Sequence, residues 1–304
     1  MRPVVVWWRV DVLLYGFRIT RRPPKIAPPS ATPHNRLKTD VVSPMGLKKI
    51  TTVMLLLLVT AGQSSQADQV LQVAVASNFL RTAKRLSDDF TATAPDVVVR
   101  LVSGSTGKLY AQIVHGAPYH IFLSADAATP QKLCDSGLAL AESQFTYAEG
   151  VLVLAAKSHE ASPTQQALVN FPSDKKIALA QPALAPYGRA AEEVLRGLKV
   201  FTSVSPQLVF GENVLQTQHF LESGLVDLAF IARPSAGEFS YWEIPRKLYA
   251  PIAQNGVTLS RGGALTLSEK FMAYMRSPRA QNIITQAGYR VPREPDAHVL
   301  GVHP

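Results

Sequence analysis

Two stretches of sequence decide the fold: Val73-Ala74-Val75-Ala76-Ser77-Asn78 and Ser103-Gly104-Ser105-Thr106-Gly107-Lys108-Leu109. Each stands at the end of an apolar run and passes into small hydroxyl residues just before a helical pattern. The first N–H groups of a helix have no partner inside the helix, and the helix dipole places positive potential there. Two such helix starts predict an anion-binding site if the fold brings them together.

The positive charge of the chain is concentrated in its first 67 residues. Residues 1–44 carry eight Arg or Lys against two Asp, and residues 45–67 add two Lys and no acid. From residue 68 onward, 21 basic residues stand against 20 acidic ones. The net charge of +9 therefore describes the leader, and we expect no nucleic-acid partner for the nearly neutral remainder.

Residues 45–67 have the pattern of a secretory signal peptide. Lys48 and Lys49 precede the apolar stretch 50–61, and Ser65-Gln66-Ala67 is a small-x-small cleavage site. We expect cleavage after Ala67 and a periplasmic protein; an uncleaved membrane anchor is the alternative, although the stretch is shorter than the ~20 residues of a spanning helix. Residues 1–44 are interpreted as sequence upstream of the true start, the alternative being a disordered cytosolic extension.

The chain offers little for catalysis or metal binding. Cys134 is the single cysteine and lies in a helical pattern, which indicates a structural thiol and excludes an internal disulfide. The seven histidines show no metal-ligand spacing, and no Gly-x-Ser-x-Gly motif is present. The stretch Gly104–Lys108 lacks the first Gly and the final Ser or Thr of a phosphate-binding P-loop. We therefore expect no cofactor, no directly bound metal and no enzymatic activity.

The chain from residue 71 alternates strand and helix patterns. Apolar runs at 71–76, 97–102 and 120–123 predict strands, and Asp126 is placed to cap the helix that follows. Between the first two runs, apolar residues recur at helical spacing at Phe79, Ala83, Leu86 and Phe90. This alternation is typical of a parallel α/β sheet with helices on both faces.

A second series of elements follows a break near residues 147–150. Strands are predicted at 151–156, 177–180, 204–210, 227–232 and 249–253, and helices at 187–200 and 216–224, with C-terminal helices around 271–275 and 283–287. A further break near residues 233–237 suggests two lobes. One lobe comprises residues 149–233, the other residues 68–148 and 234–290, with residues 291–304 as a tail.

The second predicted lobe has its own donor-rich helix starts. Pro186 stands at a first helical turn, where proline is tolerated, so the N–H groups of Tyr187 and Gly188 point outward. The stretch Gly211-Glu212-Asn213-Val214 precedes the next helix in the same way. Each lobe thus supplies two loops rich in hydrogen-bond donors, at the sheet edges where α/β proteins bind ligands.

These stretches, in this order and spacing, resemble the family of periplasmic molybdate-binding proteins of ABC transporters. The resemblance extends over residues 70–290 and is carried by Ala74–Asn78, Gly104–Leu109, Gln112-Ile113, Gly116–Pro118, Phe122–Asp126, Ala180–Pro182, Pro186–Gly188 and Gly211–Val214. It implies a type II periplasmic-binding fold: two lobes with mixed sheets, helices on both faces, and two crossing hinge segments that let the lobes close on a tetrahedral oxyanion.

The resemblance also implies the binding residues. Ser77 and Thr106 correspond to residues that donate both hydroxyl and backbone N–H, with Ser105 beside Thr106. Tyr187 and Val214 correspond to backbone N–H donors of the other lobe. Asn78 is an additional donor, whereas Ala232 stands where some members carry a ligand-contacting Tyr, which leaves that contact without a counterpart.

The implied function is a periplasmic receptor, expected as a monomer, that binds molybdate or tungstate and delivers it to a membrane permease. A receptor for sulfate or another oxyanion is the alternative within the same class. An effector-sensing domain of a transcription regulator would need an attached helix-turn-helix and no signal peptide. An exported enzyme would need an acid or base at the matched positions, which are hydroxyls and backbone.

Overall fold

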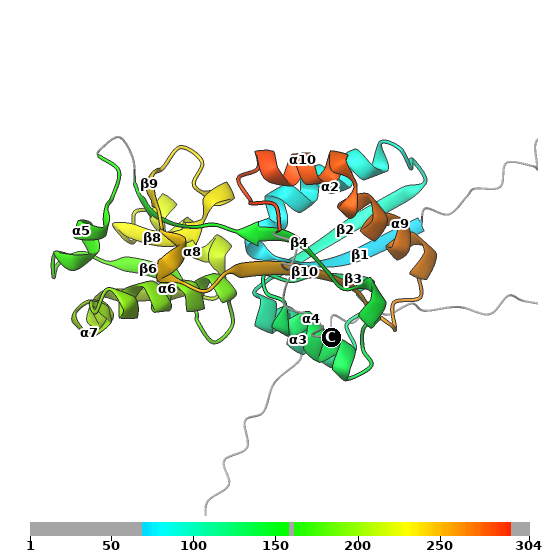
Figure 1. Ribbon diagram of the computed structural model, residues 1–304, viewed down its shortest axis with the longest axis horizontal. Helices are drawn as coiled ribbons and strands as arrows, with labels where there is room; N and C mark the ends of the chain where they lie inside the picture. Colours follow the sequence, from blue (N-terminus) through cyan, green and yellow to red (C-terminus); the bar gives the residue numbers. More distant parts are fainter. Residues whose placement is uncertain (1–68, 158–160, 293–304) are drawn as a thin grey trace, which may run out of the picture. The chain divides into compact units, whose positions relative to one another are not determined.

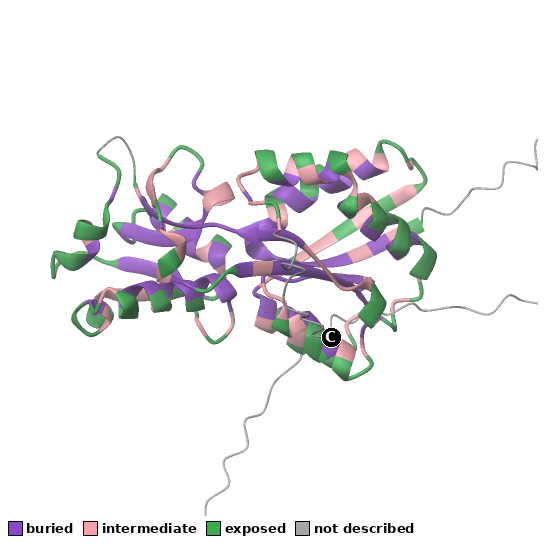
Figure 2. Ribbon diagram, viewed as in Figure 1, coloured by how far each residue is buried: buried purple, intermediate pink, exposed green. Residues whose placement is uncertain are grey.

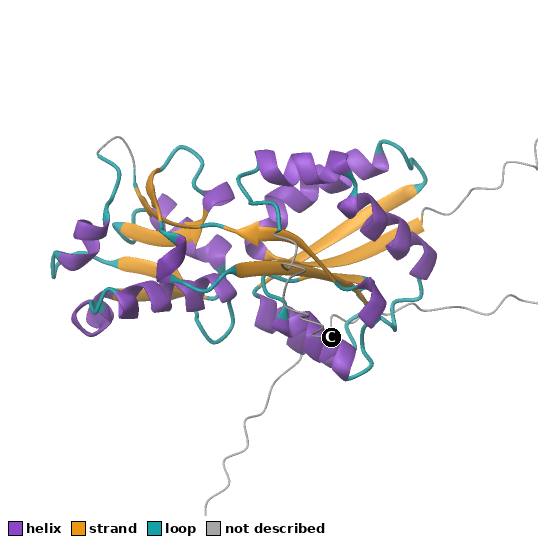
Figure 3. Ribbon diagram, in the orientation of Figure 1, coloured by secondary structure: helices purple, strands orange, loops and turns teal. Residues whose placement is uncertain are grey.

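The structure is a computed structural model that describes residues 69–157 and 161–292 (Figure 1). The predicted upstream extension 1–44, the signal peptide 45–67 and nearly all of the predicted tail lie outside the described residues. Two separate five-stranded sheets form the framework, each flanked by helices (Figure 3). We call the first sheet with its helices lobe 1 and the second sheet with its helices lobe 2.

Lobe 1 has the strand order β2-β1-β3-β10-β4. Its first three strands are parallel, and β10 pairs antiparallel with both β3 and β4. The strands are β1 (Gln69–Ala76), β2 (Val97–Gly104), β3 (Ile121–Leu123), β4 (Phe145–Gly150) and β10 (Ile252–Thr258). The helices are α2 (Leu80–Thr91), α3 (Thr106–Val114), α4 (Ala128–Asp135), α9 (Leu265–Arg276) and α10 (Pro278–Gln286), with short 3-10 turns η1 (Ser77–Phe79) and η2 (Ala141–Ser143).

Strand β1 is apolar along most of its length because helices cover both faces of its sheet. Side chains alternate across a strand, so Leu71, Val73 and Val75 join the core formed with α2, α9 and α10. Ala74 instead joins the core on the other face, where α3 and α4 pack. The inner strands are accordingly buried in both lobes, whereas the edge strands β2, β7 and β9 are mostly part-exposed and the outer faces of the helices are exposed (Figure 2).

Lobe 2 has the strand order β7-β6-β8-β5-β9. Strand β6 is parallel to β7 and β8, whereas β5 is antiparallel to β8 and β9. The strands are β5 (Leu152–Ala156), β6 (Ile177–Ala180), β7 (Leu208–Gly211), β8 (Leu228–Ala232) and β9 (Ser240–Glu243). The helices are α5 (Gln165–Val169), α6 (Pro186–Gly197), α7 (Phe201–Val204) and α8 (Val214–Glu222), with 3-10 turns η3 (Ser205–Gln207), η4 (Arg233–Ser235) and η5 (Arg246–Leu248).

This architecture confirms the predicted fold class, because both sheets are mixed, both carry helices, and the chain crosses between them twice. The crossings run from β4 into β5 and from β9 into β10. The predicted lobe boundary at residue 234 is wrong. Strand β9 pairs antiparallel with β5, and Ile244 is fully buried in the lobe 2 core. The Pro and Gly residues near 234–237 therefore mark a turn inside lobe 2.

Two predicted strands are displaced in the structure. The predicted strand 204–210 is a 3-10 turn followed by β7, because Pro206 has no N–H with which to join a strand ladder. The predicted strand 249–253 begins three residues later and continues to Thr258 as β10. No helix in the described residues is long and apolar enough to span a membrane.

Candidate functional site

The first two loops of the site follow strands β1 and β2 of lobe 1. Strand β1 ends at Ala76 and passes directly into η1 at Ser77, while Ser105 has an extended backbone and is the N-cap of α3. Ser77, Ser105 and Thr106 are all buried. The parallel pairing of β1 with β2 places the two strand ends side by side, with Ala76 opposite Gly104.

The other two loops begin helices of lobe 2. Ala185 is the extended N-cap of α6, and Pro186 occupies its first turn. Helix α8 begins at Val214 after Asn213, whose side chain accepts a hydrogen bond of 3.0 Å from the Gln216 N–H. The backbone N–H groups of Tyr187 and Val214 lie in these first turns, where the helix provides no carbonyl partner.

These four loops enclose one small cavity between the lobes. All six predicted site residues line it: Ser77, Asn78, Ser105, Thr106, Tyr187 and Val214. The remaining lining residues are Ala76, Gly104, Ala125, Ala185 and Pro186. The cavity has a volume of about 10 Å³, far below the ~300–1,000 Å³ of sites for drug-sized ligands. It suits a ligand of a few heavy atoms.

The described residues that line the cavity include no Lys, Arg, His, Asp or Glu. Its polar groups are hydroxyls, one amide and the backbone. Helix N-termini from both lobes add positive potential without a formal charge. Among the described residues, moreover, no group of three His, Cys, Asp or Glu could hold a metal ion. The arrangement can solvate an anion through uncharged donors.

The two lining hydroxyls at the start of α3 are available as donors. Thr106 Oγ1 accepts a hydrogen bond of 3.1 Å from the Ala125 N–H, which leaves its own hydrogen free. Ser105 Oγ is buried and has no hydrogen-bond partner among the described residues. A buried hydroxyl without a partner is costly, and a ligand that accepts its hydrogen bond would remove that cost.

The Asn78 side chain is engaged behind the cavity. Its Nδ2 donates to Gln254 Oε1 at 2.7 Å, and the Tyr289 hydroxyl donates to its backbone carbonyl at 2.7 Å. Burial raises the pKa of Tyr289, so this phenol remains a protonated donor. The Asn78 amide therefore holds η1 in place, and its remaining contribution toward the cavity is the backbone.

Sequence reasoning did not find Gln254 and Tyr289, because they come from β10 and from beyond α10, far from Asn78 in the chain. No local pattern distinguishes them from ordinary core residues. Tyr147 belongs to the same buried group, since its hydroxyl donates to the Ser124 carbonyl at 2.9 Å.

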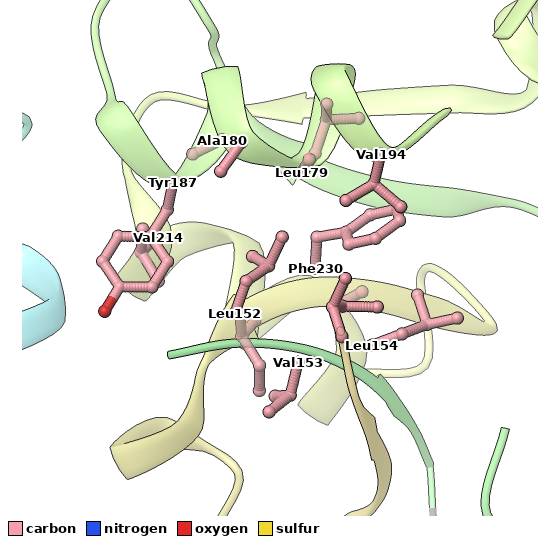
Figure 4. Packing of buried hydrophobic residues seen from close by; sticks show 14 of the residues in the cluster. Leu152, Val153, Leu154, Leu179, Ala180, Tyr187, Val194, Val214 and Phe230 are labelled. Atoms are coloured by element: carbon pink, nitrogen blue, oxygen red, sulfur yellow. The ribbon is translucent and has the colours of Figure 1, made fainter. Parts of the chain in front are cut away.

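Tyr187 connects the cavity to the first crossing segment. Its ring packs in the lobe 2 core beside Val214, with the hydroxyl directed away from the apolar cluster (Figure 4). A Cβ on Gly150 would overlap this hydroxyl oxygen. Only glycine therefore fits at the end of β4 while Tyr187 keeps this position. Ala232, by contrast, is fully buried in β8 and does not line the cavity.

Cys134 lies away from the cavity, in α4. Burial raises the pKa of its thiol, and Sγ lies 3.5 Å from Gln144 Oε1. Both observations agree with the predicted structural thiol, because a reactive cysteine needs a lowered pKa.

Known proteins resemble this chain over both lobes. A family described as bacterial extracellular solute-binding protein matches residues 71–290. The molybdate-binding protein ModA of Azotobacter vinelandii is 35% identical over 239 residues, which cover 77% of this chain and 93% of that protein. ModA of Rhodobacter capsulatus is 36% identical over 219 residues, covering 71% and 86%. The solved structure of the Azotobacter vinelandii periplasmic molybdate-binding protein has a TM-score of 0.70 at 37% identity and covers 73% of this chain and 100% of that one.

Proposed function

The chain belongs to the family of bacterial extracellular solute-binding proteins, and we propose that the solute it binds is molybdate. The observation that carries the proposal is the small cavity between the lobes, lined by uncharged donors from four helix starts. The relatives named as molybdate-binding proteins, at 35% and 36% identity, support the choice of anion.

The donor set suits a fully ionised tetrahedral dianion. Burying such an ion costs several kcal/mol or more unless its oxygens are hydrogen-bonded. Hydrogen bonds to a charged group contribute roughly 1.5–3 kcal/mol each, so several preorganised donors can offset that cost. A protonated oxyanion must also donate a hydrogen bond, and backbone N–H groups cannot accept one.

The proposed contacts follow from the placement of each donor. Ser77, Ser105 and Thr106 would donate their hydroxyls from lobe 1, with the Asn78 backbone beside them. Tyr187 and Val214 would donate backbone N–H groups from lobe 2. Because the donors come from both lobes, the anion binds most strongly when the lobes are closed around it.

The finer parts of the proposal concern the biological setting. Tungstate has nearly the size and the same charge as molybdate, so these contacts would bind both. The receptor would act as a monomer in the periplasm after cleavage near Ala67, and would deliver its anion to an ABC permease. It would catalyse no reaction, since neither an acid nor a base lines the cavity.

Calorimetric titration of the purified protein with molybdate, tungstate, sulfate and phosphate tests the proposal. We expect molybdate and tungstate to bind with a Kd of about 1 μM or lower, which corresponds to roughly −8 kcal/mol or better. Sulfate is smaller and would stretch the hydrogen bonds, so we expect it to bind at least about tenfold more weakly. Tight sulfate binding without any molybdate heat would overturn the choice of anion.

A further inference from the structure

Four charged side chains stand within two residues of the cavity lining, on α3, on α6 and on the segments before α4 and α8. Lys108 follows Thr106 by two residues, and Asp126 follows Ala125 directly. In lobe 2, Arg189 and Glu212 each stand two residues from a lining residue, Tyr187 and Val214 respectively. Each lobe therefore presents one cation and one anion at the rim of the cavity.

These charges pair from lobe to lobe. Lys108 Nζ lies 2.7 Å from Glu212 Oε2, and the Arg189 guanidinium lies 2.7 Å from Asp126 Oδ2. Beside the first pair, the Gly107 N–H donates to the Leu184 carbonyl at 2.9 Å. The other ion pairs in the described part of the chain lie within one lobe or at the crossing segments.

The backbones approach each other closely at Gly107. A Cβ at this position would lie 3.2 Å from both the Cα and the carbonyl oxygen of Leu184. Gly107 and Lys108 are the residues that give the sequence its superficial similarity to a P-loop. Here both make contacts to the opposite lobe, and neither lines the cavity.

We propose that the pairs Lys108–Glu212 and Arg189–Asp126, with the Gly107–Leu184 hydrogen bond, form a latch that stabilises the closed protein. The three contacts require the lobes to be together, so they shift the open–closed equilibrium toward the state that also encloses the anion. The latch therefore slows ligand release without touching the ligand. This inference rests on the proposed function.

The two ion pairs stabilise the closed protein to different extents. Asp126 is held in place because its Oδ1 accepts a hydrogen bond of 2.9 Å from the Thr129 N–H, and its side chain is only 15% exposed. Lys108 and Glu212 are 44% and 63% exposed, so solvent and salt screen their attraction more strongly. Loss of the Arg189–Asp126 pair should therefore raise the rate of ligand release more than loss of the Lys108–Glu212 pair.

Charge reversal on the more exposed pair tests the latch most cleanly, since neither residue caps a helix with its side chain. We expect Lys108→Glu and Glu212→Lys each to raise the molybdate release rate and Kd about five- to tenfold, as when an attraction becomes a repulsion. The double variant, which exchanges the two charges, should return both values to within about twofold of wild type.

The matched control is Lys175→Glu, which causes the same change in net charge. Lys175 pairs with Asp227 inside lobe 2, at 49% and 42% side-chain exposure. We expect this variant to release molybdate at the wild-type rate.

Arg189→Gln should raise the release rate by about tenfold. High salt should narrow the difference in release rate between wild type and the Lys108→Glu variant. A double variant no better than its single parents, or unchanged release in both Lys108→Glu and Arg189→Gln, would overturn the latch.

A ligand-free measurement separates this inference from the proposed function. Nitroxide labels on Val114→Cys in lobe 1 and Leu225→Cys in lobe 2, in a Cys134→Ser background, report the distance between the lobes. We expect Lys108→Glu to lengthen the mean distance in the absence of any anion and the charge-exchanged variant to restore it. If wild type binds no molybdate, the proposed function fails and these distances alone decide the latch; unchanged distances would refute it.

Discussion

Single residues at this site are distinguished by which of their hydrogen-bonding groups remain free. Ser105 Oγ has no partner, Thr106 has one free hydrogen, and the Asn78 amide is already engaged with Gln254. In isolation, the side chains of serine, threonine and asparagine can all both donate and accept hydrogen bonds. Their surroundings therefore favour Ser105 and Thr106 as donors in the proposed site, whereas the Asn78 side chain supports η1.

Ser105→Ala is the sharpest test at this scale. The variant loses a buried hydroxyl that has no partner among the described residues, so without ligand its free energy of unfolding in urea should match that of wild type or exceed it by up to about 1–3 kcal/mol. Molybdate binding should weaken by roughly 1.5–3 kcal/mol, or about 10- to 100-fold in Kd. Ser136→Ala, at the exposed end of α4, is the control and should bind normally. Wild-type affinity in Ser105→Ala would remove this residue from the site.

At the scale of elements, the helix starts and the strands that cross between the lobes have different roles. The helix starts bring donors to the cavity, whereas the crossing strands join the two lobes. Gly150 connects the two kinds of element, because it ends the crossing strand β4 and lies against the hydroxyl of Tyr187 at the start of α6. A change at the crossing should therefore disturb the start of α6.

Gly150→Ala should lower the free energy of unfolding by about 1–3 kcal/mol, as the new methyl group overlaps Tyr187 and lies 3.0 Å from Ile252 Cγ2. The loss should be smaller in a Tyr187→Phe background, since part of the overlap is with the hydroxyl. Gly197→Ala, where a Cβ meets nothing within 4 Å in α6, should instead stabilise the protein slightly. Equal costs for Gly150→Ala in the two backgrounds would contradict the contact.

At the scale of the whole molecule, the proposed site lies between two lobes in one uncharged cavity. Among the described residues, no carboxylate, imidazole, ammonium or guanidinium lines the cavity, and the titratable group that belongs to a lining residue is the Tyr187 phenol. Burial raises the pKa of Tyr187, and also of Tyr147 and Tyr289 behind the site. These phenols are therefore neutral throughout the physiological pH range, with and without ligand.

The Kd for molybdate should accordingly stay constant within about twofold between pH 6 and pH 8. A raised tyrosine pKa moves ionisation further above this window, so no proton is gained or lost by these groups on binding. Titrations in two buffers with different ionisation enthalpies should give the same heat. A Kd that rises tenfold across this window would indicate a titrating group in contact with the anion.

The sequence by itself determined the features that depend on neighbouring residues. Strand ends that pass into Ser77 or Ser105 and Thr106, proline in the first turn of α6, and the helical spacing of α2 are local patterns. Local sterics and hydrogen bonding dictate them directly. For that reason the elements that carry the cavity were predictable, together with the fold class to which they belong.

Only the tertiary structure decided what lies between elements distant in the chain. It placed β9 in lobe 2, turned the Asn78 amide toward Gln254, fitted Gly150 against Tyr187 and paired Lys108 with Glu212. Each of these contacts joins residues dozens of positions apart, and several alternative partners of the same chemistry exist in the sequence. Close packing and the relative position of the two lobes select among them, which no local pattern encodes.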